Sequence, residues 1–324
     1  MKIAQNTTLI ILAFFSIYVI WGSTYMLNKV AVAELPPFFL ASIRFTSAGL
    51  LIFIISKAMG KSLAITRKQF INAFIVGVLF LSFGNGVIVW ALKFVDSGFA
   101  ALEISAQPLV VLFLMWLLQG KKIKPMSLVG VGLGVVGIFL LVGQKQIITN
   151  DDTLIGMIMI FACMLSWAYG SLFVGKADLP KNFFVNTGYQ MFTAGITLAV
   201  ASLLFGENWV APTNWGQPVQ LSMVLLIIFG SIVAFTSFNF LLKTVSPDKV
   251  ATSTYVNPII ALFLGWYFLN EQITGQSIIA AAVLLTGVYF INTTRTSITL
   301  PRFSGKVEGK TPKKTLQNKK DLQK

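Results

Sequence analysis

The chain has 324 residues, of which 56% are hydrophobic and 11% charged, and it carries a formal net charge of +14 with no histidine and one cysteine. Because a soluble protein has charged residues at about a quarter of its positions, this composition excludes an ordinary soluble domain. With no histidine and with Cys163 alone, the chain lacks His/Cys zinc sites, Ser-His-Asp triads, Cys-His dyads and an intrachain disulfide, so we expect no metal, no cofactor and no enzymatic activity.

Apolar segments separated by turn signals or short charged clusters follow one another along the whole chain. They lie at roughly 8–28, 36–56, 69–92, 97–119, 126–143, 153–174, 182–205, 219–242, 247–269 and 275–293. About 20 helical residues cross a hydrocarbon core of about 30 Å. The sequence therefore predicts an all-α integral membrane protein with ten transmembrane helices. We expect the first segment to be a span, because it is too long for the core of an ordinary signal peptide.

Lysine and arginine residues concentrate in alternate loops. With the N-terminus inside, the inner segments hold 21 of them and the outer segments hold only Lys29, Lys93 and Lys145. Cytoplasmic loops of membrane proteins carry this excess of positive charge. We therefore expect a multi-pass inner-membrane protein whose N- and C-termini are both cytoplasmic.

Half of the net charge lies in residues 295–324, where nine lysines and arginines face only Glu308 and Asp321. Few apolar residues occur there, so we expect a disordered basic cytoplasmic tail. Because the positive charge lies in this tail, we do not expect a nucleic-acid partner. We expect the tail to bind anionic lipid headgroups as a secondary effect.

The second half of the chain repeats the first. A shift of 150 residues aligns 92–142 with 242–292 with twelve identities, and a shift of 146 aligns Trp21 with Trp167 and Gly49 with Gly195. We therefore predict a first five-helix repeat at 1–147, a second at 148–294 and the tail at 295–324. An odd number of helices per half makes the halves enter the membrane in opposite directions, which is the architecture of many secondary transporters.

Short motifs recur in the same order within these halves. They are Trp21-Gly22-Ser23, Arg44-Phe45, Gly84-Asn85-Gly86, Gln107-Pro108, and Asn257-Pro258 with Gly265-Trp266-Tyr267-Phe268-Leu269-Asn270-Glu271 after it. With them the chain resembles the EamA-domain branch of the drug/metabolite transporter superfamily over residues 8–293. The resemblance implies a ten-helix exporter of amino acids, other metabolites or drugs, with a central cavity. A glutamate commonly follows the fourth helix in this family; Lys121 stands there, and we expect its counterpart Glu271 to cap or pack a helix end.

Two charged residues, Arg44 and Glu103, fall well inside the predicted spans. A charge at the membrane centre costs about 2.5–3.5 kcal/mol on insertion scales, so such residues are functional candidates. They lie about 12 Å and about 9 Å from the outer ends of their helices. We expect them to line the cavity, with Glu103 meeting a cationic group or a proton and Arg44 a carboxylate; the alternatives are an ion pair with each other or a structural role.

The repeat adds polar pairs to this prediction. Glu103 and Gln107 are i, i+4 neighbours, and their counterparts Ser253 and Asn257 are again such a pair; each pair ends before a proline. The two polar pairs could form facing walls of one cavity, or they could mark structural hinges that are held by interhelical hydrogen bonds. The further substrate-binding or coupling candidates, for which helix-packing contacts are the alternative, are Trp21, Tyr25, Asn85, Gln190, Tyr255 and Asn239.

We therefore expect a secondary transporter that exports small metabolites, such as amino acids and related compounds, or drugs by alternating access. Protons are the candidate coupling ion. The nucleotide-binding Gly-x-x-x-x-Gly-Lys-Ser/Thr motif is absent, so an ATP-driven pump is not indicated. The alternative is a lipid-intermediate flippase of the same fold.

Overall fold

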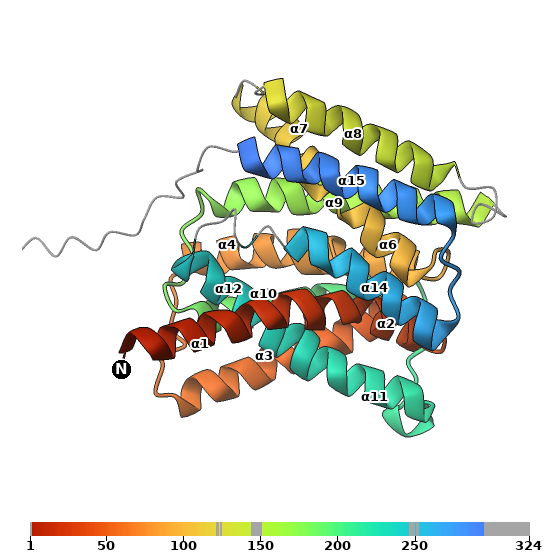
Figure 1. Cartoon of the computed structure of the whole chain (residues 1–324). Coiled ribbons are helices and arrows are strands. Elements are labelled where there is room, and N and C mark those ends of the chain that lie inside the picture. Colours follow the sequence, from red (N-terminus) through yellow and green to blue (C-terminus); the bar gives the residue numbers. More distant parts are fainter. Residues whose placement is uncertain are drawn as a thin grey trace, which may run out of the picture.

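A computed structural model of the chain describes residues 2–120, 123, 125–143, 151–245, 250 and 253–294. Every regular element in these ranges is a helix and none is a strand, which confirms the predicted all-α class (Figure 1). Seven of the helical stretches are long and apolar enough to cross a membrane, and they are Thr7–Val32, Pro37–Ala58, Arg67–Ala91, Ser97–Gln119, Asp152–Val174, Phe183–Leu204 and Gln217–Leu241. Three shorter apolar helices accompany them at Pro125–Leu141, Ser253–Leu269 and Gly275–Ile291.

The elements of the first half follow the predicted order, with several spans built from more than one helical piece. They are α1 (Lys2–Phe15), the π-helix η1 (Ser16–Ile20), α2 (Trp21–Val32), α3 (Pro37–Ala58), α4 (Arg67–Gly77), the π-helix η2 (Val78–Phe83), α5 (Gly86–Ala91), α6 (Ser97–Ile104), α7 (Gln107–Gln119) and α8 (Pro125–Val142). The break between α6 and α7 lies at the Gln107-Pro108 motif, because proline cannot donate the hydrogen bond that would continue the helix.

The second half is built in the same way. Its elements are α9 (Asp151–Val174), α10 (Phe183–Leu204), the 3₁₀ turn η3 (Pro212–Asn214), α11 (Gln217–Leu225), the π-helix η4 (Leu226–Val233), α12 (Ala234–Thr244), α14 (Ser253–Leu269) and α15 (Gly275–Thr294). A π-helix interrupts the third span of the first half (η2) and the corresponding span of the second half (η4). Such bulges are rare and are frequent at functional sites.

Helices α3 and α10 pack against each other in an antiparallel arrangement. A side chain at Gly49 would meet the backbone nitrogen of Phe192 at 2.6 Å, and one at Gly195 would meet that of Thr46 at 2.5 Å. Under the 146-residue shift Gly49 corresponds to Gly195 and Thr46 to Phe192. The same contact is therefore made twice, with the roles of the two halves exchanged.

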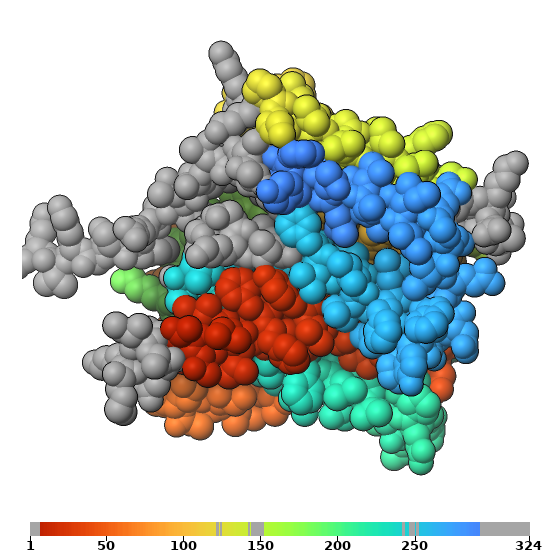
Figure 2. All heavy atoms as spheres, viewed as in Figure 1, coloured from red at the N-terminus to blue at the C-terminus, as the bar shows by residue number. Residues whose placement is uncertain are grey.

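Helices α8 and α15 repeat this relation in a second pair, in the upper layer of the view in Figures 1 and 2. A side chain at Gly137 would lie 2.6 Å from Leu284 Cβ, and one at Gly287 would lie 2.7 Å from the backbone nitrogen of Gly134. The 150-residue shift exchanges these two contacts. The small residues let the helix axes approach closely, as in other membrane helix pairs.

The chain turns at two ends of the bundle. One end, which we call the glutamate face, is formed by residues 32–39, 92–98, 205–217 and 269–275; it is the right-hand end in Figure 1. The opposite face is formed by residues 58–67 and 174–183, where Asn72 donates to the carbonyl of Asp178 at 2.9 Å. Large apolar side chains are exposed along the helices between the two faces, as bilayer contact requires.

Candidate functional site

Arg44 is held in the middle of α3, and only 2% of its surface is exposed. Its Nε–H donates to Ser231 Oγ of η4 at 2.9 Å, and its Nη1 donates to Asn28 Oδ1 of α2 at 3.3 Å. Gly230 lies beside the other guanidinium nitrogen, because a Cβ there would be 3.4 Å from Nη2. Within the described part of the chain no carboxylate pairs with this cation, which is stabilised by neutral acceptors and by the Phe45 ring, whose centre lies 4.8 Å from Cζ.

Glu103 lies in α6 and is 5% exposed. Its Oε2 atom is buried and has no hydrogen-bond partner among the residues that the structure describes. The helix α6 that carries Glu103 packs against α2 and α9. A buried carboxylate oxygen without a donor is costly to the stability of the fold.

Arg44 and Glu103 do not form an ion pair with each other in the described structure. Each is instead held beside α2, because Arg44 binds Asn28 of α2 and the helix α6 that carries Glu103 packs against α2. The structure thus keeps the two predicted charges separate.

The Gln107 and Asn257 amides are engaged by backbone carbonyls. Gln107 Nε2 donates to Met164 O at 3.0 Å, and in the orientation that satisfies its amide Asn257 donates to Ile17 O at 2.8 Å and Tyr18 O at 3.0 Å. The repeat relates Gln107 to Asn257 and Met164 to Tyr18. These are interhelical hydrogen bonds between the halves, in agreement with the second reading of the polar pairs.

Two further candidates, Gln190 and Asn239, bind neighbouring residues of α10. Gln190 donates to Asn186 on its own helix at 3.2 Å, and Asn239 donates to Thr187 Oγ1 at 2.8 Å, joining α12 to α10. Asn85 lies at the break between η2 and α5.

The two aromatic candidates are packed against apolar side chains. Trp21 lies 5.1 Å from Phe238 and 6.3 Å from Phe235, ring centre to ring centre. Tyr255 lies against the apolar cluster that contains Leu109 and Leu284.

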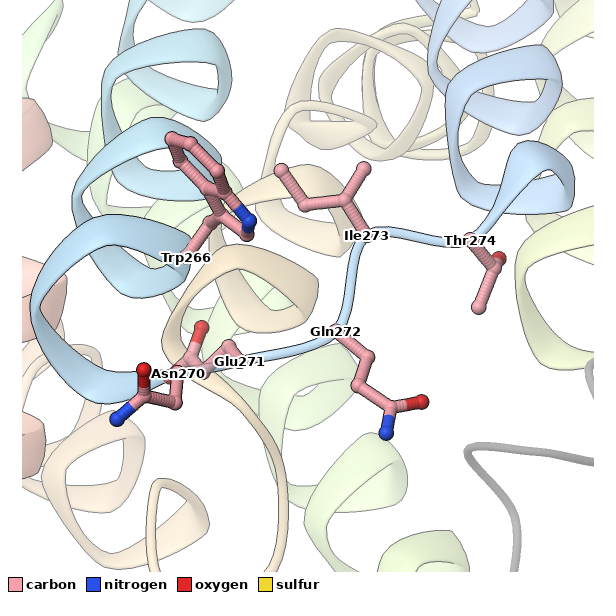
Figure 3. Close-up of a pocket in the computed structure, with 6 residues that line it drawn as sticks. All are labelled: Trp266, Asn270, Glu271, Gln272, Ile273 and Thr274. Carbon is pink, nitrogen blue, oxygen red and sulfur yellow. The ribbon is translucent and has the colours of Figure 1, made fainter.

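Glu271 caps a helix end, as expected. Its Oε1 accepts from the Ser97 N–H at 2.7 Å, and its Oε2 accepts from the Gly98 N–H and from Ser97 Oγ, each at 3.0 Å. The loop that carries it is drawn in Figure 3, where an open pocket of about 440 Å³ is lined by residues 266 and 270–274. Asn270 ends α14 with a positive φ of 55°, the conformation that Gly120 adopts at the corresponding position of the first half.

Asp96 lies next to this cap, in the turn before α6. Burial, the largest cause, raises the pKa of the Asp96 carboxyl above its usual value of 3.8; the nearby Glu271 carboxylate raises this pKa further, and Lys29 lowers it. Lys29 Nζ also donates to the carbonyls of Leu92 and Val95 at 2.7 Å each. A charged cluster therefore surrounds the start of α6.

Sequence reasoning missed several residues of these networks. The sequence around Ser231 does not indicate its bond to Arg44, because Ser231 is one hydroxyl residue beside a glycine in an apolar helix. Glu34 and Glu207 did give a signal, since they are acidic residues in loops that are almost free of charge, and both bind backbone N–H groups of the other half.

A bundle of apolar helices around buried, unpaired charges defines a multi-pass membrane protein of the transport class. The EamA-like transporter family matches residues 8–143 and 154–293, so the chain belongs to this family and carries its unit twice. The match confirms the predicted resemblance.

Individual relatives agree with this assignment. The chain is 32% identical over 281 residues to the "Uncharacterized inner membrane transporter YedA" of Escherichia coli (strain K12), covering 86% of this chain and 89% of that protein. It is 23% identical to the "Uncharacterized transporter YoaV" of Bacillus subtilis (strain 168), covering 88% and 96%. A solved structure titled "Crystal structure of protein" shares the fold, with a TM-score of 0.63 at 20% identity, over 88% of this chain and 96% of that one.

Proposed function

We propose that the chain is a secondary transporter that exports small metabolites, such as amino acids and related compounds, or drugs by alternating access. Its ten transmembrane helices would form two inverted five-helix repeats, 1–147 and 148–294, followed by the cytoplasmic tail 295–324. The N-terminus would lie in the cytoplasm as well.

The observation that carries this proposal is the exchange relation between the halves. The contact of Gly49 with Phe192 has its counterpart in the contact of Gly195 with Thr46, in which the two halves exchange roles. The contact of Gly137 with α15 has its counterpart in the contact of Gly287 with α8. Two halves related like this can each adopt the other's conformation, so one sequence supplies an inward-open and an outward-open state of similar energy.

The proposed substrate site lies beside Tyr25 and Asn28 of the first span. Arg44 would bind an anionic group of the cargo, because a guanidinium binds carboxylates well and this one has neutral partners only. Glu103 would bind a cationic group or a coupling proton through the oxygen that has no donor. A zwitterion such as an amino acid matches one cation and one anion. The other polar candidates would orient or hold the walls of this site.

Reconstituted protein tests the proposal. Candidate cargo would first be found by comparing metabolite export and growth resistance between an overexpressing strain and a deletion strain. Proteoliposomes should then show counterflow, in which unlabelled cargo inside accelerates uptake of labelled cargo, whereas empty liposomes should not. Lipid scrambling without counterflow would favour the flippase, and conversion of the cargo would favour an enzyme.

A further inference from the structure

Carboxylates at the glutamate face bind the helices of the opposite half. Glu271, from the second half, accepts both backbone N–H groups at the start of α6 in the first half. The loop is shaped for this contact: a side chain at Gly265 would collide with the Glu271 carboxylate, and the left-handed Asn270 turns the chain toward α6 (Figure 3).

Two more glutamates at the same face make the same kind of contact. Glu207, from the second half, accepts the N–H groups of Phe38 at 3.1 Å and Phe39 at 2.7 Å, at the start of α3 in the first half. Glu34, from the first half, accepts the Gly216 N–H at 2.9 Å, at the start of α11 in the second half. All three contacts therefore join the two halves.

Helix capping alone does not require partners from the other half. Helix α4 is capped by its own Thr66, with Gln69 completing a capping box, and α10 is capped by its own Asn182. Helix α15 has a local Thr274 cap at the glutamate face. By contrast, the residues preceding α3, α6 and α11 provide no side-chain cap. In the described part of the chain, the starts of α3, α6 and α11 are instead bound by carboxylates of the opposite half.

Three described hydrogen bonds join the halves at the opposite face. Asn72 donates to the carbonyl of Asp178, Gln69 Nε2 lies 3.4 Å from Asp178 Oδ1, and Tyr189 donates its hydroxyl to the carbonyl of Leu63 at 3.0 Å. In these three bonds the donors are neutral side chains, and two of the three acceptors are neutral carbonyls. The bonds of Glu34, Glu207 and Glu271 at the glutamate face instead place a carboxylate on the positive end of a helix dipole, which strengthens them.

We propose that Glu34, Glu207 and Glu271 form a latch that holds the transport path closed at the glutamate face, and that opening toward this face breaks their bonds to α11, α3 and α6. This inference rests on the proposed alternating access. It follows because a rocking of one half against the other at this face must separate each glutamate from its helix. The predicted charge bias of the loops makes this the outer face.

The single cysteine of the chain provides the test. Cys163 is fully buried on α9, which packs against the helix α6 that carries Glu103, and it should react with a membrane-impermeant methanethiosulfonate only when the path is open. Cells or sealed vesicles would carry the wild type, the triple variant Glu34→Gln, Glu207→Gln and Glu271→Gln, or the control Asp152→Asn. Asp152 is an exposed carboxylate at the start of α9. Cys163→Ser gives the background.

The latch predicts that labelling of Cys163 from the outer side becomes about tenfold faster in the triple variant, the change that about 1.4 kcal/mol makes in an equilibrium constant. Labelling should be unchanged in Asp152→Asn. Gly265→Ala, which displaces Glu271 without altering any charge, should accelerate labelling as well. The thermal unfolding of each variant in detergent is measured alongside; if the triple variant is not folded, the single variant Glu271→Gln and Gly265→Ala decide the question.

Unchanged labelling in folded latch variants, or faster labelling only from the opposite side, would overturn the latch and leave ordinary capping as the role of these residues. The assay requires no cargo. Counterflow that persists with unchanged labelling therefore rejects the latch alone, whereas accelerated labelling without any counterflow supports the latch and rejects transport.

Discussion

The Nε–H group of Arg44 donates a hydrogen bond of 2.9 Å to the hydroxyl of Ser231 across the interface between α3 and η4. This bond joins the two halves of the chain and orients a buried cation toward α2 without neutralising it. A charged hydrogen bond of this kind is worth about 1.5–3 kcal/mol. The pair therefore fixes the geometry of the proposed anion site.

Two replacements of Arg44 distinguish the effect of its positive charge from that of its planar arrangement of donors. Arg44→Lys keeps the charge but loses the planar set of donors, so we expect counterflow of an anionic or zwitterionic cargo to fall about tenfold, and Arg44→Ala to reduce it about 100-fold. Ser231→Ala should give a smaller loss, because Asn28 still accepts from the guanidinium. Initial rates in proteoliposomes at equal protein density measure these effects; wild-type rates in Arg44→Ala would remove Arg44 from the site.

Glu103→Gln tests proton coupling. The variant keeps the size of the side chain but cannot exchange a proton, so we expect uptake driven by a pH gradient to be lost while counterflow without a gradient continues. Transport with and without the gradient is compared in the same vesicles. A gradient response equal to that of the wild type would show that the coupling proton binds elsewhere.

The close helix pairs predict matched effects on stability. Gly137→Ala and Gly287→Ala should each destabilise the protein by about 1–3 kcal/mol, because the added methyl group meets the neighbouring helix at less than 3 Å. Gly132→Ala on the same helix is the control, since nothing lies within 4 Å of its Cβ position, and it should be neutral or slightly stabilising. Thermal unfolding in detergent distinguishes them. Equal melting temperatures for Gly132→Ala and Gly137→Ala would contradict the packing of α8 on α15.

Asp96 should make stability depend on pH. Because burial raises its pKa in the folded protein, the folded state holds this proton more tightly than the unfolded chain does. That contribution is fully present below the unfolded pKa, near 3.8, and is lost as the pH rises through the higher folded value. We therefore expect Asp96→Asn to melt at a higher temperature than the wild type at pH 7, with a difference that shrinks toward pH 4. A difference independent of pH would reject this assignment.

Much of the fold could be predicted from the sequence, since apolar length and repeated Pro, Trp and Gly positions are properties of the chain itself. Gly49/Gly195 and Gly137/Gly287 were visible as aligned pairs before their contacts were known. The three short helices 125–141, 253–269 and 275–291 show the limit of that reasoning, because apolar length alone does not establish a span.

The candidate site was harder to predict. Arg44 and Glu103 are conspicuous because they are charged, but the partners of Arg44 depend on tertiary packing that brings η4 and α2 beside α3. The sequence left cavity walls and interhelical hydrogen bonds open for the Gln107 and Asn257 amides, and their carbonyl partners in the other half depend on tertiary packing. Glu34 and Glu207 could not be assigned to α11 and α3, because no local pattern encodes a contact between loops some 170–180 residues apart.

The most direct test of the inverted relation of the halves is to determine on which side of the membrane each of two equivalent loops lies. In a Cys163→Ser background, Lys122→Cys and Gln272→Cys lie at positions that the 150-residue shift superimposes, and each can be labelled with an impermeant maleimide from either side. The account predicts labelling of Lys122→Cys from the cytoplasm only and of Gln272→Cys from the outside only. Labelling of both from the same side would contradict it.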